Sequence, residues 1–408
     1  MTDRLYYTDP YLRAFDATFT RVDRGDDRLA VTLDRTAFYP TSGGQPFDTG
    51  LLGGLGVVDV IDEEDGSITH IVEPRTPNSA PGTNPEPGTV NPERGHPVHG
   101  ELDWPRRFDH MQQHSGQHVL SAAFDKLFSV RTVSFHLGAA VSTIDLAREM
   151  TPAEIAAAEA EANRVVWEDR PVSIRFADAA EAARLPLRKE PARGGTLRLI
   201  EVEGFDLSAC GGTHVARTGG IGVIAVASWE RFKGGQRLEL LCGGRALTGY
   251  RTLRDTVAAG VRLLSVLPEE LPPAIERLQA DAKDHKRLMN GLQSELARYR
   301  GDELAATAET VGSHRLVARA IDADANGLKA LAAAVTAKPG LVVVLASTTT
   351  PALVVIARSK DVGVSAQQLL TELMAEFGGR GGGRSEMAQG GGLAATTASI
   401  FDAVRKRL

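Results

Sequence analysis

Short runs of alternating apolar and polar residues dominate the first part of the chain. They occur in 17–25, 28–40, 56–66 and 67–73, and glycine and Asp-Gly turns separate them. This period of two is typical of short β-strands with one buried face. We therefore expect a small β-barrel as the N-terminal domain, over 1–98. The stretch 74–98 has many Pro, Asn and Gly and no period, which indicates a loop.

A helical period replaces this pattern further on. Residues 107–129 place apolar side chains three and four apart, and Thr151, Pro152 and Glu154 make a helix start. Strand-like runs surround these two helices, at 130–147, 171–178, 197–204, 222–234 and 236–243. We expect an α+β domain over 99–250, with helices laid on a mainly antiparallel sheet.

The C-terminal part has two further patterns. Apolar positions alternate spacings of three and four from Ile275 to Tyr299, which predicts a coiled-coil-like helical arm over 251–308. An ordinary amphipathic helix is the alternative. Residues 309–408 read as an α/β domain of βαββα order, followed by a glycine-rich stretch at 378–392 and a last helix.

Composition narrows the class of protein. The 408 residues are 42% hydrophobic and 24% charged, and no apolar run is long enough to predict a membrane span. The N-terminus shows no secretory pattern and only two cysteines occur, so we expect a cytoplasmic protein without disulfides. The net charge is −6, but residues 251–408 carry 20 Lys and Arg against 17 Asp and Glu. Any RNA would therefore be held better by the C-terminal part.

Two short motifs predict a metal site. His114 and His118 lie one helical turn apart in HSGQH, and Cys210 and His214 lie four apart in CGGTH. Three imidazoles and one thiolate suit Zn²⁺, a borderline-soft ion that four such ligands bind tetrahedrally. Four protein ligands would make a structural site, whereas an open position would make a catalytic one, and both readings stay open. His110 is expected to contact the ligands without binding the metal itself, or to lie in the core.

A glycine loop is the second candidate for chemistry. Residues 36–45 end a strand in a Gly43-Gly44-Gln45 turn, where backbone N–H groups could approach a ligand closely. A plain Gly-Gly hairpin turn is an equally good reading.

These segments together resemble a known family. FYPTSGGQPFDTG, HSGQH and SACGGTHVARTGGIG are similar to the editing domain of alanyl-tRNA synthetase and of its free-standing relatives, the AlaX-type editing proteins. The glycine-rich stretch at 378–392 resembles a motif of the synthetase's C-terminal domain. The resemblance covers nearly the whole chain, so the chain looks like the long form of the AlaX proteins. Thr41-Ser42 departs from the acidic residue and glycine that the synthetase often has.

The resemblance implies roles for individual residues. It makes His114, His118, Cys210 and His214 the Zn²⁺ ligands. The pocket for the terminal adenosine and its aminoacyl ester would be lined by Gly43, Gly44 and Gln45, beside Thr41. Thr36 would contact a serine hydroxyl. The C-terminal domain would grip the outer corner of tRNA, with Arg380 and Arg384 supplying charge.

The implied activity is hydrolysis of mischarged tRNA(Ala), chiefly Ser-tRNA(Ala) and in some members Gly-tRNA(Ala). Because the chain starts at the barrel, we expect a trans-editing deacylase without an adenylate-forming domain. A homodimer through the arm and the C-terminal domain is also expected. Two alternatives are a zinc-stabilised tRNA-binding protein without catalysis and a deacylase for another mischarged tRNA.

Overall fold

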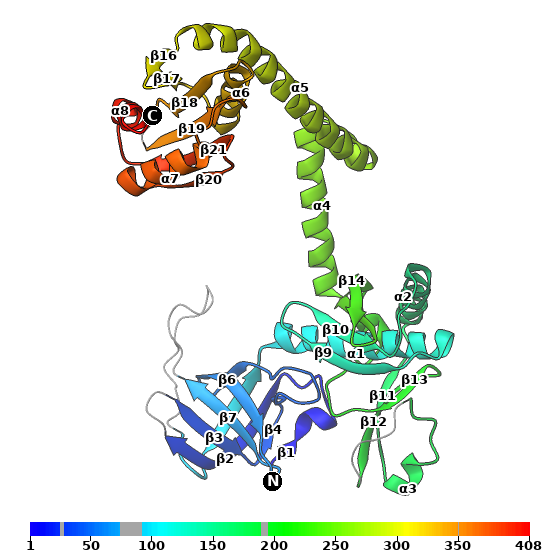
Figure 1. Ribbon diagram of the computed structural model, residues 1–408. Coiled ribbons are helices and arrows are strands. Elements are labelled where there is room, and N and C mark those ends of the chain that lie inside the picture. The colour runs from blue at the N-terminus through cyan, green and yellow to red at the C-terminus, as the bar shows by residue number, and fades with distance from the viewer. Residues whose placement is uncertain (25–27, 74–91, 189–194, 350) are drawn as a thin grey trace. The chain divides into compact units, whose positions relative to one another are not determined.

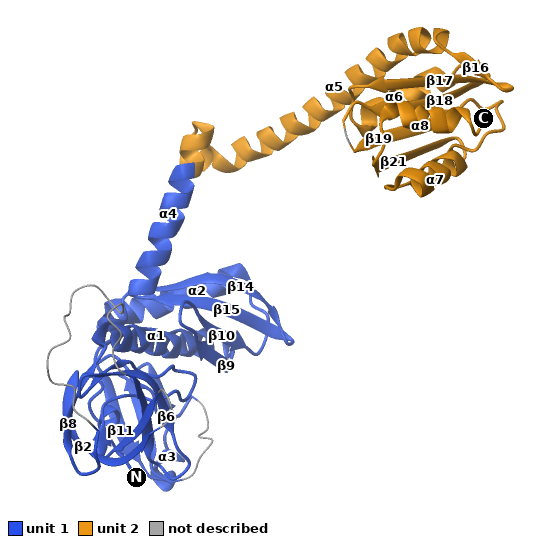
Figure 2. Ribbon diagram, turned by 90° about the vertical axis from the view of Figure 1, so that its left-hand side faces the viewer, with its two compact units in different colours: residues 1–259 blue, residues 260–408 orange. Residues whose placement is uncertain are grey.

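A computed structural model describes residues 1–24, 28–73, 92–188, 195–349 and 351–408. The chain divides into two compact units, Met1–Ala259 and Gly260–Leu408, which Figure 2 colours separately. Most of the stretch 74–98, expected to be a loop, lies outside the described residues. In the part of the chain that is described, no helix is both long and apolar enough to cross a membrane.

The first unit begins with the predicted barrel (Figure 1). Six antiparallel strands close it in the order β2-β3-β7-β6-β5-β8, and Phe15, Phe19 and Val31 lie in its core. The last strand, β8, runs past residue 98. A short parallel pair, β1 and β4, leads from the N-terminus to the glycine loop. The bounds are β1 Asp3–Arg4, a 3-10 turn Leu5–Tyr7, β2 Ala14–Arg24, β3 Leu29–Leu33, β4 Arg35–Thr36, β5 Gly50–Leu52, β6 Leu55–Asp62, β7 Ile68–Glu73 and β8 Pro97–Leu102.

The α+β body follows within the same unit. Its four-stranded antiparallel sheet has the order β14-β15-β10-β9, and a three-stranded sheet has the order β11-β12-β13. The strand β13 was not predicted. The bounds are α1 Trp104–Phe128, β9 Thr132–Leu137, β10 Ser142–Leu146, α2 Pro152–Trp167, β11 Val172–Ala177, α3 Ala179–Ala182, β12 Leu197–Val202, β13 Asp206–Ala209, a 3-10 turn Thr218–Ile221, β14 Ile224–Phe232 and β15 Gly235–Cys242.

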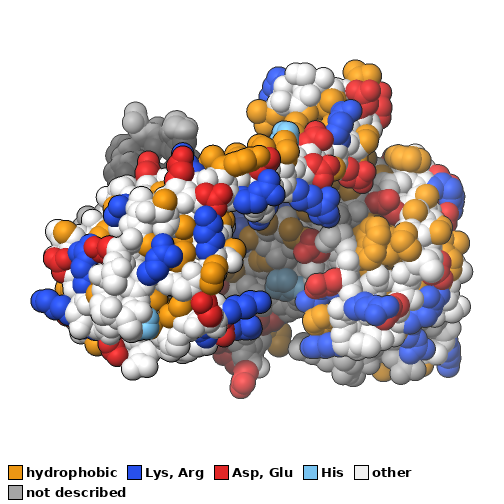
Figure 3. All heavy atoms as spheres, turned by 45° about the horizontal axis from the view of Figure 1, so that its top comes forward, with side chains coloured by type: hydrophobic (Ala, Val, Ile, Leu, Met, Phe, Trp, Pro, Cys, Tyr) orange, Lys and Arg blue, Asp and Glu red, His pale blue; other side chains and the backbone are white. Residues whose placement is uncertain are grey.

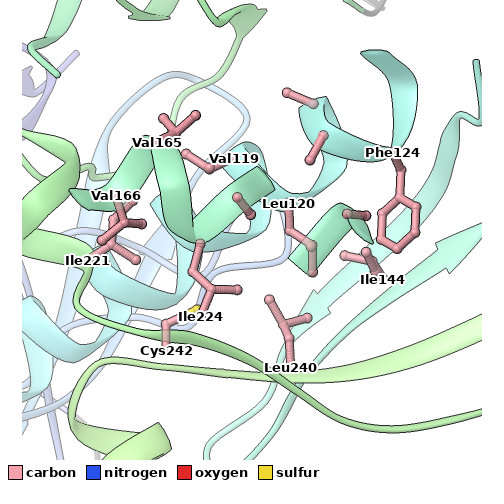
Figure 4. Packing of buried hydrophobic residues seen from close by; sticks show 14 of the residues in the cluster. Val119, Leu120, Phe124, Ile144, Val165, Val166, Ile221, Ile224, Leu240 and Cys242 are labelled. Carbon is pink, nitrogen blue, oxygen red and sulfur yellow. The ribbon is translucent and has the colours of Figure 1, made fainter. Parts of the chain in front are cut away.

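The helix α2 begins where the sequence predicts, whereas α1 begins at Trp104, ahead of the predicted range 107–129. Thr151 caps α2, and its side chain and that of Glu154 satisfy each other's backbone N–H groups. The side chain of Asp103 caps α1. Apolar side chains from α1, α2 and the sheet converge on one core, which Figure 4 shows around Leu120, Ile224 and Leu240. This core holds α1, and therefore its two histidines, in place.

Two long helices occupy the predicted arm. These are α4 Gly244–Leu264 and α5 Leu271–Ala306, with a 3-10 turn at Pro268–Glu270 between them. The positions of α5 with this alternating spacing, which we call the seam, are all exposed: Ile275, Leu278, Ala282, His285, Met289, Leu292, Leu296 and Tyr299. A different face of α5 is buried near its end, where Ala297 and Ala305 enter the core beside α6 and Gly301 lies against Ala334. A coiled coil therefore stays a prediction.

The second unit ends in one six-stranded sheet of order β16-β17-β18-β19-β21-β20. The expected βαββα order is present, but β18 and β19 are antiparallel and the sheet is mixed. The glycine-rich stretch forms a β-hairpin, β20 with β21. The bounds are β16 Glu309–Val311, β17 His314–Ile321, α6 Ala325–Thr336, β18 Leu341–Ser347, β19 Ala352–Arg358, α7 Ala366–Phe377, β20 Arg380–Gly383, β21 Met387–Leu393 and α8 Thr397–Arg405.

Candidate metal centre

The fold brings the two predicted motifs together. His114 and His118 project from α1, and Cys210 and His214 come from the turn that follows β13. One ligand atom from each of these four residues lies within 4.8 Å of the other three. The sulfur of Cys210 is 3.3 Å from Nε2 of His114 and 3.3 Å from Nε2 of His214. The spacing in the sequence thus predicted a real cluster.

The second glycine of CGGTH is required by close packing. A Cβ atom at Gly212 would lie 2.1 Å from Cε1 of His114 and 2.4 Å from its Nδ1. No side chain can be tolerated there without moving the imidazole. The turn can therefore reach the helix only because this position is glycine.

Each histidine of the cluster has its other ring nitrogen beside a polar side chain. Nδ1 of His114 is 2.8 Å from Oε1 of Gln45, and Nδ1 of His214 is 3.2 Å from Oγ of Ser115. Nδ1 of His118 forms an ion pair with Asp206 at 3.3 Å. Such outer partners orient metal-binding imidazoles and set their tautomer. The arrangement leaves Nε2 of His114 and His214 directed at the Cys210 sulfur.

Electrostatics favours the ligand form of the thiol and of one imidazole. Burial opposes ionisation of Cys210, but the His114 and His214 rings hold the pKa of its thiol well below the ordinary value. Burial lowers the pKa of His214 to about 3, so its ring is neutral. His118 differs: despite its burial, Asp206 and Cys210 raise its pKa to about 9. A metal must therefore displace a proton from His118.

A buried arginine clamps the CGGTH turn. Arg198, on β12, donates from Nη1 to the carbonyls of Cys210 at 2.7 Å and Gly212 at 2.9 Å. Its Nε donates to the carbonyl of Tyr7 at 2.9 Å. Sequence reasoning missed this residue, because a lone arginine in a strand carries no signal of what it will contact.

The glycine loop is a two-residue hairpin turn. Ser42 and Gln45 exchange backbone hydrogen bonds of 3.1 and 2.9 Å, and Gly43 and Gly44 have φ of +53° and +82°. Positive φ at both central residues is the signature of a type I′ turn, which explains the two glycines. The carbonyl of Gly44 accepts from the backbone N–H of Leu137 at 3.1 Å, which ties the turn to β9.

The side chains of this loop point in different directions. Gln45 is fully buried, whereas Thr41 is exposed. Phe135, on β9, lies beside both the turn and the metal cluster, because a Cβ at Gly44 would lie 2.8 Å from its ring and its centroid is 5.6 Å from that of His114. The sequence did not single out Phe135 as a site residue.

A fully buried ion pair fixes the base of the loop. Nε of Arg107 donates to both carboxylate oxygens of Asp48, at 3.1 and 3.0 Å, and its other nitrogens reach the carbonyls of Pro10 and Ala37. Asp48 also accepts from the backbone N–H of Tyr39 at 2.7 Å. Because Arg107 lies on α1, this pair joins the loop to the helix of His114 and His118.

Thr36 lies inside the barrel, fully buried. Its Oγ1 is 2.8 Å from Nε2 of His70 and accepts from the N–H of Phe38 at 3.1 Å. Nδ1 of His70 faces the carbonyl of Val31 at 3.2 Å and so carries the proton of the neutral ring. The Thr36 hydroxyl therefore donates to His70 and keeps one lone pair for another donor.

The remaining predicted residues lie elsewhere. His110 is buried outside the four-residue cluster, and burial lowers its pKa to about 4. Cys242, the second cysteine, is fully buried. Arg380 and Arg384 are exposed, in β20 and directly after it, within the second unit. On the face shown in Figure 3, basic and acidic side chains are interspersed.

Each of the two units contains a segment that matches a known protein family. Residues 197–239 match the family described as threonyl and alanyl tRNA synthetase second additional domain, and residues 312–408 match the DHHA1 domain. The alanyl-tRNA editing protein AlaX-L of Pyrococcus horikoshii is 33% identical over 419 residues, which cover 100% of this chain and 98% of that protein. The chain therefore belongs to the AlaX-L family of alanyl-tRNA editing proteins.

Alanine–tRNA ligases are similar over a smaller share of their own length. The ligase of Pyrococcus abyssi is 33% identical over 406 residues, which are 95% of this chain and 42% of the ligase. The ligase of Halobacterium salinarum is 35% identical over 410 residues, again 42% of its length. The C-Ala domain of Aquifex aeolicus alanyl-tRNA synthetase is 27% identical over 24% of this chain, with a TM-score of 0.23.

Proposed function

We propose that this protein hydrolyses the aminoacyl ester of tRNA(Ala) mischarged with serine, with glycine as a second mischarged substrate. The observation that carries the proposal is the convergence of His114, His118, Cys210 and His214 in a chain related to AlaX-L over its full length. Family membership supports an aminoacyl-tRNA deacylase. The amino acid removed is our own inference.

The donor set fits Zn²⁺. Three imidazoles and a thiolate with a lowered pKa match the ligands that this ion prefers. When bound, Zn²⁺ would supply positive charge that either fixes the turn or polarises the ester and its water. The residues that would hold it are His114, His118, Cys210 and His214.

The glycine turn offers a site for the developing oxyanion. In a two-residue hairpin the flanking residues exchange the backbone hydrogen bonds, which leaves the N–H groups of Gly43 and Gly44 for a ligand. Two such donors at an oxyanion are typically worth about 3–4 kcal/mol each in the transition state. We infer that the ester carbonyl lies against this turn, beside Thr41.

The central experiment measures release of serine from Ser-tRNA(Ala), beside Ala-tRNA(Ala), by the wild type and by Cys210→Ala refilled with zinc. We expect serine-selective cleavage by the wild type and its loss in the variant. Tight tRNA binding without cleavage by the wild type would instead identify a tRNA-binding protein. Faster cleavage of another aminoacyl-tRNA would identify a deacylase of different specificity.

Thr36 is proposed to select serine. Its one free lone pair could accept a hydrogen bond from the serine hydroxyl, which alanine lacks. A site that must otherwise leave a buried polar group unpaired can discriminate by up to about 10⁴-fold. We therefore expect Thr36→Val to reduce the serine-over-alanine ratio more than it reduces total turnover, in the same deacylation assay. Equal losses on both esters would contradict this role.

The second unit is proposed to bind tRNA through Arg380 and Arg384. Both guanidinium groups are exposed on and after β20, where they can contact phosphates. Removing both charges should weaken tRNA binding and flatten its salt dependence, measured by filter binding at two salt concentrations. Unchanged binding would place the tRNA surface elsewhere.

A further inference from the structure

The side chain of Gln45 contacts the metal cluster directly. It is fully buried, and its amide bonds two elements that are distant in the sequence. Oε1 lies 2.8 Å from Nδ1 of His114 and 3.1 Å from the backbone nitrogen of Thr213. Nε2 donates to Oγ1 of Thr213 at 2.9 Å. One amide therefore joins the glycine turn, α1 and the CGGTH turn.

The chemistry of these contacts fixes the orientation of the amide. The backbone N–H of Thr213 can only donate, so the atom that faces it must be the oxygen of Gln45. A flipped amide would set two donors against each other. Since the same oxygen faces Nδ1 of His114, that nitrogen carries the proton. The lone pair of His114 is then on Nε2, which lies 3.3 Å from the Cys210 sulfur.

Packing leaves this junction little freedom. A Cβ at Gly212 would lie 3.1 Å from Oε1 of Gln45, in addition to its collision with the His114 ring. On its other side Gln45 is the last residue of the type I′ turn, whose Gly44 carbonyl accepts from Leu137. A movement of His114 would therefore be passed to the turn through a single side chain.

We propose that Gln45 is a positioning residue of the metal centre, which holds His114 in the Nδ1–H tautomer and thereby couples the glycine turn to the bound metal. This inference rests on the metal site of the proposed function. It differs from the expectation that the Gln45 amide contacts the aminoacyl ester, because the side chain is fully buried and its oxygen and nitrogen already bond to His114 and Thr213.

The test compares Gln45→Met and Gln45→Glu with Gln117→Met in the full-length protein. Gln117 is equally buried on α1, but its amide donates to Ser121, so it serves as the matched control. Zinc affinity is measured by chelator competition, and the geometry by the absorption spectrum of the Co²⁺-loaded protein. We expect Gln45→Met to lose about 10- to 100-fold in affinity and to change the spectrum.

Gln45→Glu should bind metal nearly as the wild type does, since a carboxylate accepts from both N–H groups. Wild-type affinity and spectrum in Gln45→Met would overturn the proposal. The tautomer is tested without any variant: long-range ¹H–¹⁵N correlation of the zinc-loaded wild type should show His114 protonated at Nδ1. Protonation at Nε2 would overturn the proposal even if the variants do not fold.

Deacylation assays at saturating zinc separate this inference from the proposed function. Loss of serine release in a Gln45→Met protein with wild-type metal affinity and spectrum would make Gln45 a substrate contact, so the inference fails and the deacylase stands. Altered metal binding in Gln45→Met, together with a wild-type protein that binds zinc but has no deacylase activity, would support the inference and refute the proposed function.

Discussion

At the scale of single residues, the atoms packed against a glycine show that its position cannot carry a larger side chain. Gly116 lies between the two histidines of HSGQH, and a Cβ there would be 2.3 Å from the sulfur of Cys242 and 3.3 Å from Ile221. The same core that positions α1 therefore excludes any larger residue at this position.

Gly116→Ala should destabilise the first unit by about 1–3 kcal/mol, the usual cost of overpacking a core. Gly291→Ala is the matched helical control: no atom lies within 4 Å of its Cβ, and alanine should be neutral or stabilise by up to about 1 kcal/mol. Chemical denaturation measures both. Adding Cys242→Ala to Gly116→Ala should recover part of the loss. No recovery would show that the sulfur is not the obstacle.

His70 makes the stability of the barrel depend on pH. Burial lowers the pKa of its folded form to about 4, below the ordinary value of 6.5. The unfolded chain therefore takes up a proton first as the pH falls. The stability contributed by neutral His70 is complete above pH 6.5 and is lost between 6.5 and 4, by up to about 3 kcal/mol.

Urea unfolding at pH 7.5 and pH 4.5 tests this for the wild type and for His70→Gln, which keeps a donor and an acceptor. The variant should lose about 2–3 kcal/mol less than the wild type over this interval. His110 also has a lowered pKa, but it is common to both proteins and cancels. Equal losses would mean that His70 is protonated without cost.

The four cluster residues could be predicted because spacing alone puts His114 and His118 on one helix face and Cys210 and His214 in one turn. Their supporting residues could not. Ser115, Asp206 and Arg198 have ordinary sequence surroundings, and only folding places them beside the cluster. Gln45 was singled out as a loop residue, but its contact with His114 spans 69 positions.

At the scale of elements, the buried pair of Asp48 and Arg107 connects the glycine loop to α1. Both side chains are fully buried, so removal of one charge leaves the other without compensation. We expect Asp48→Asn to cost about 3–5 kcal/mol of unfolding free energy, measured by denaturant titration.

Glu161→Gln is the control for this prediction. Glu161 pairs with Arg164 one turn further along the exposed face of α2, and its loss should cost less than about 1 kcal/mol. Similar costs for the two substitutions would contradict a special role of the buried pair. A lower zinc affinity in Asp48→Asn would further show that the loop base supports the metal cluster.

Elements with a clear hydrophobic period were predicted well, and those without one were not. The barrel and the helices α1 and α2 are confirmed, because their buried faces repeat along the sequence. Strand β13 has four residues, too few for a period. The hairpin of β20 and β21 is rich in glycine, so backbone pairing rather than side-chain burial defines it. Backbone pairing of this kind cannot be predicted from the pattern of apolar and polar side chains.

At the scale of the whole molecule, the exposed seam of α5 favours a homodimer. Apolar side chains at 275, 278, 289, 292, 296 and 299 are between 42% and 64% exposed, and together with positions 282 and 285 they repeat with alternating spacings of three and four. A stripe of this kind normally packs against a second helix. If the arm packed along its own unit instead, the apolar stripe would be buried. The only buried residues of α5 are Ala274, Ala297, Gly301 and Ala305, which lie outside the stripe.

We therefore predict a dimer whose association depends on this seam. Sedimentation equilibrium should give twice the 43.5 kDa chain mass for the wild type at micromolar concentration, and the monomer mass for Leu292→Glu combined with Leu296→Glu. A charge buried in the seam would have to be desolvated without a partner, which opposes association. Ala280→Glu combined with Ser294→Glu, on the exposed side of α5 opposite the seam, adds the same two charges and should leave the dimer intact. A wild-type monomer, or equal dissociation by this control pair, would show that the seam does not hold two copies together.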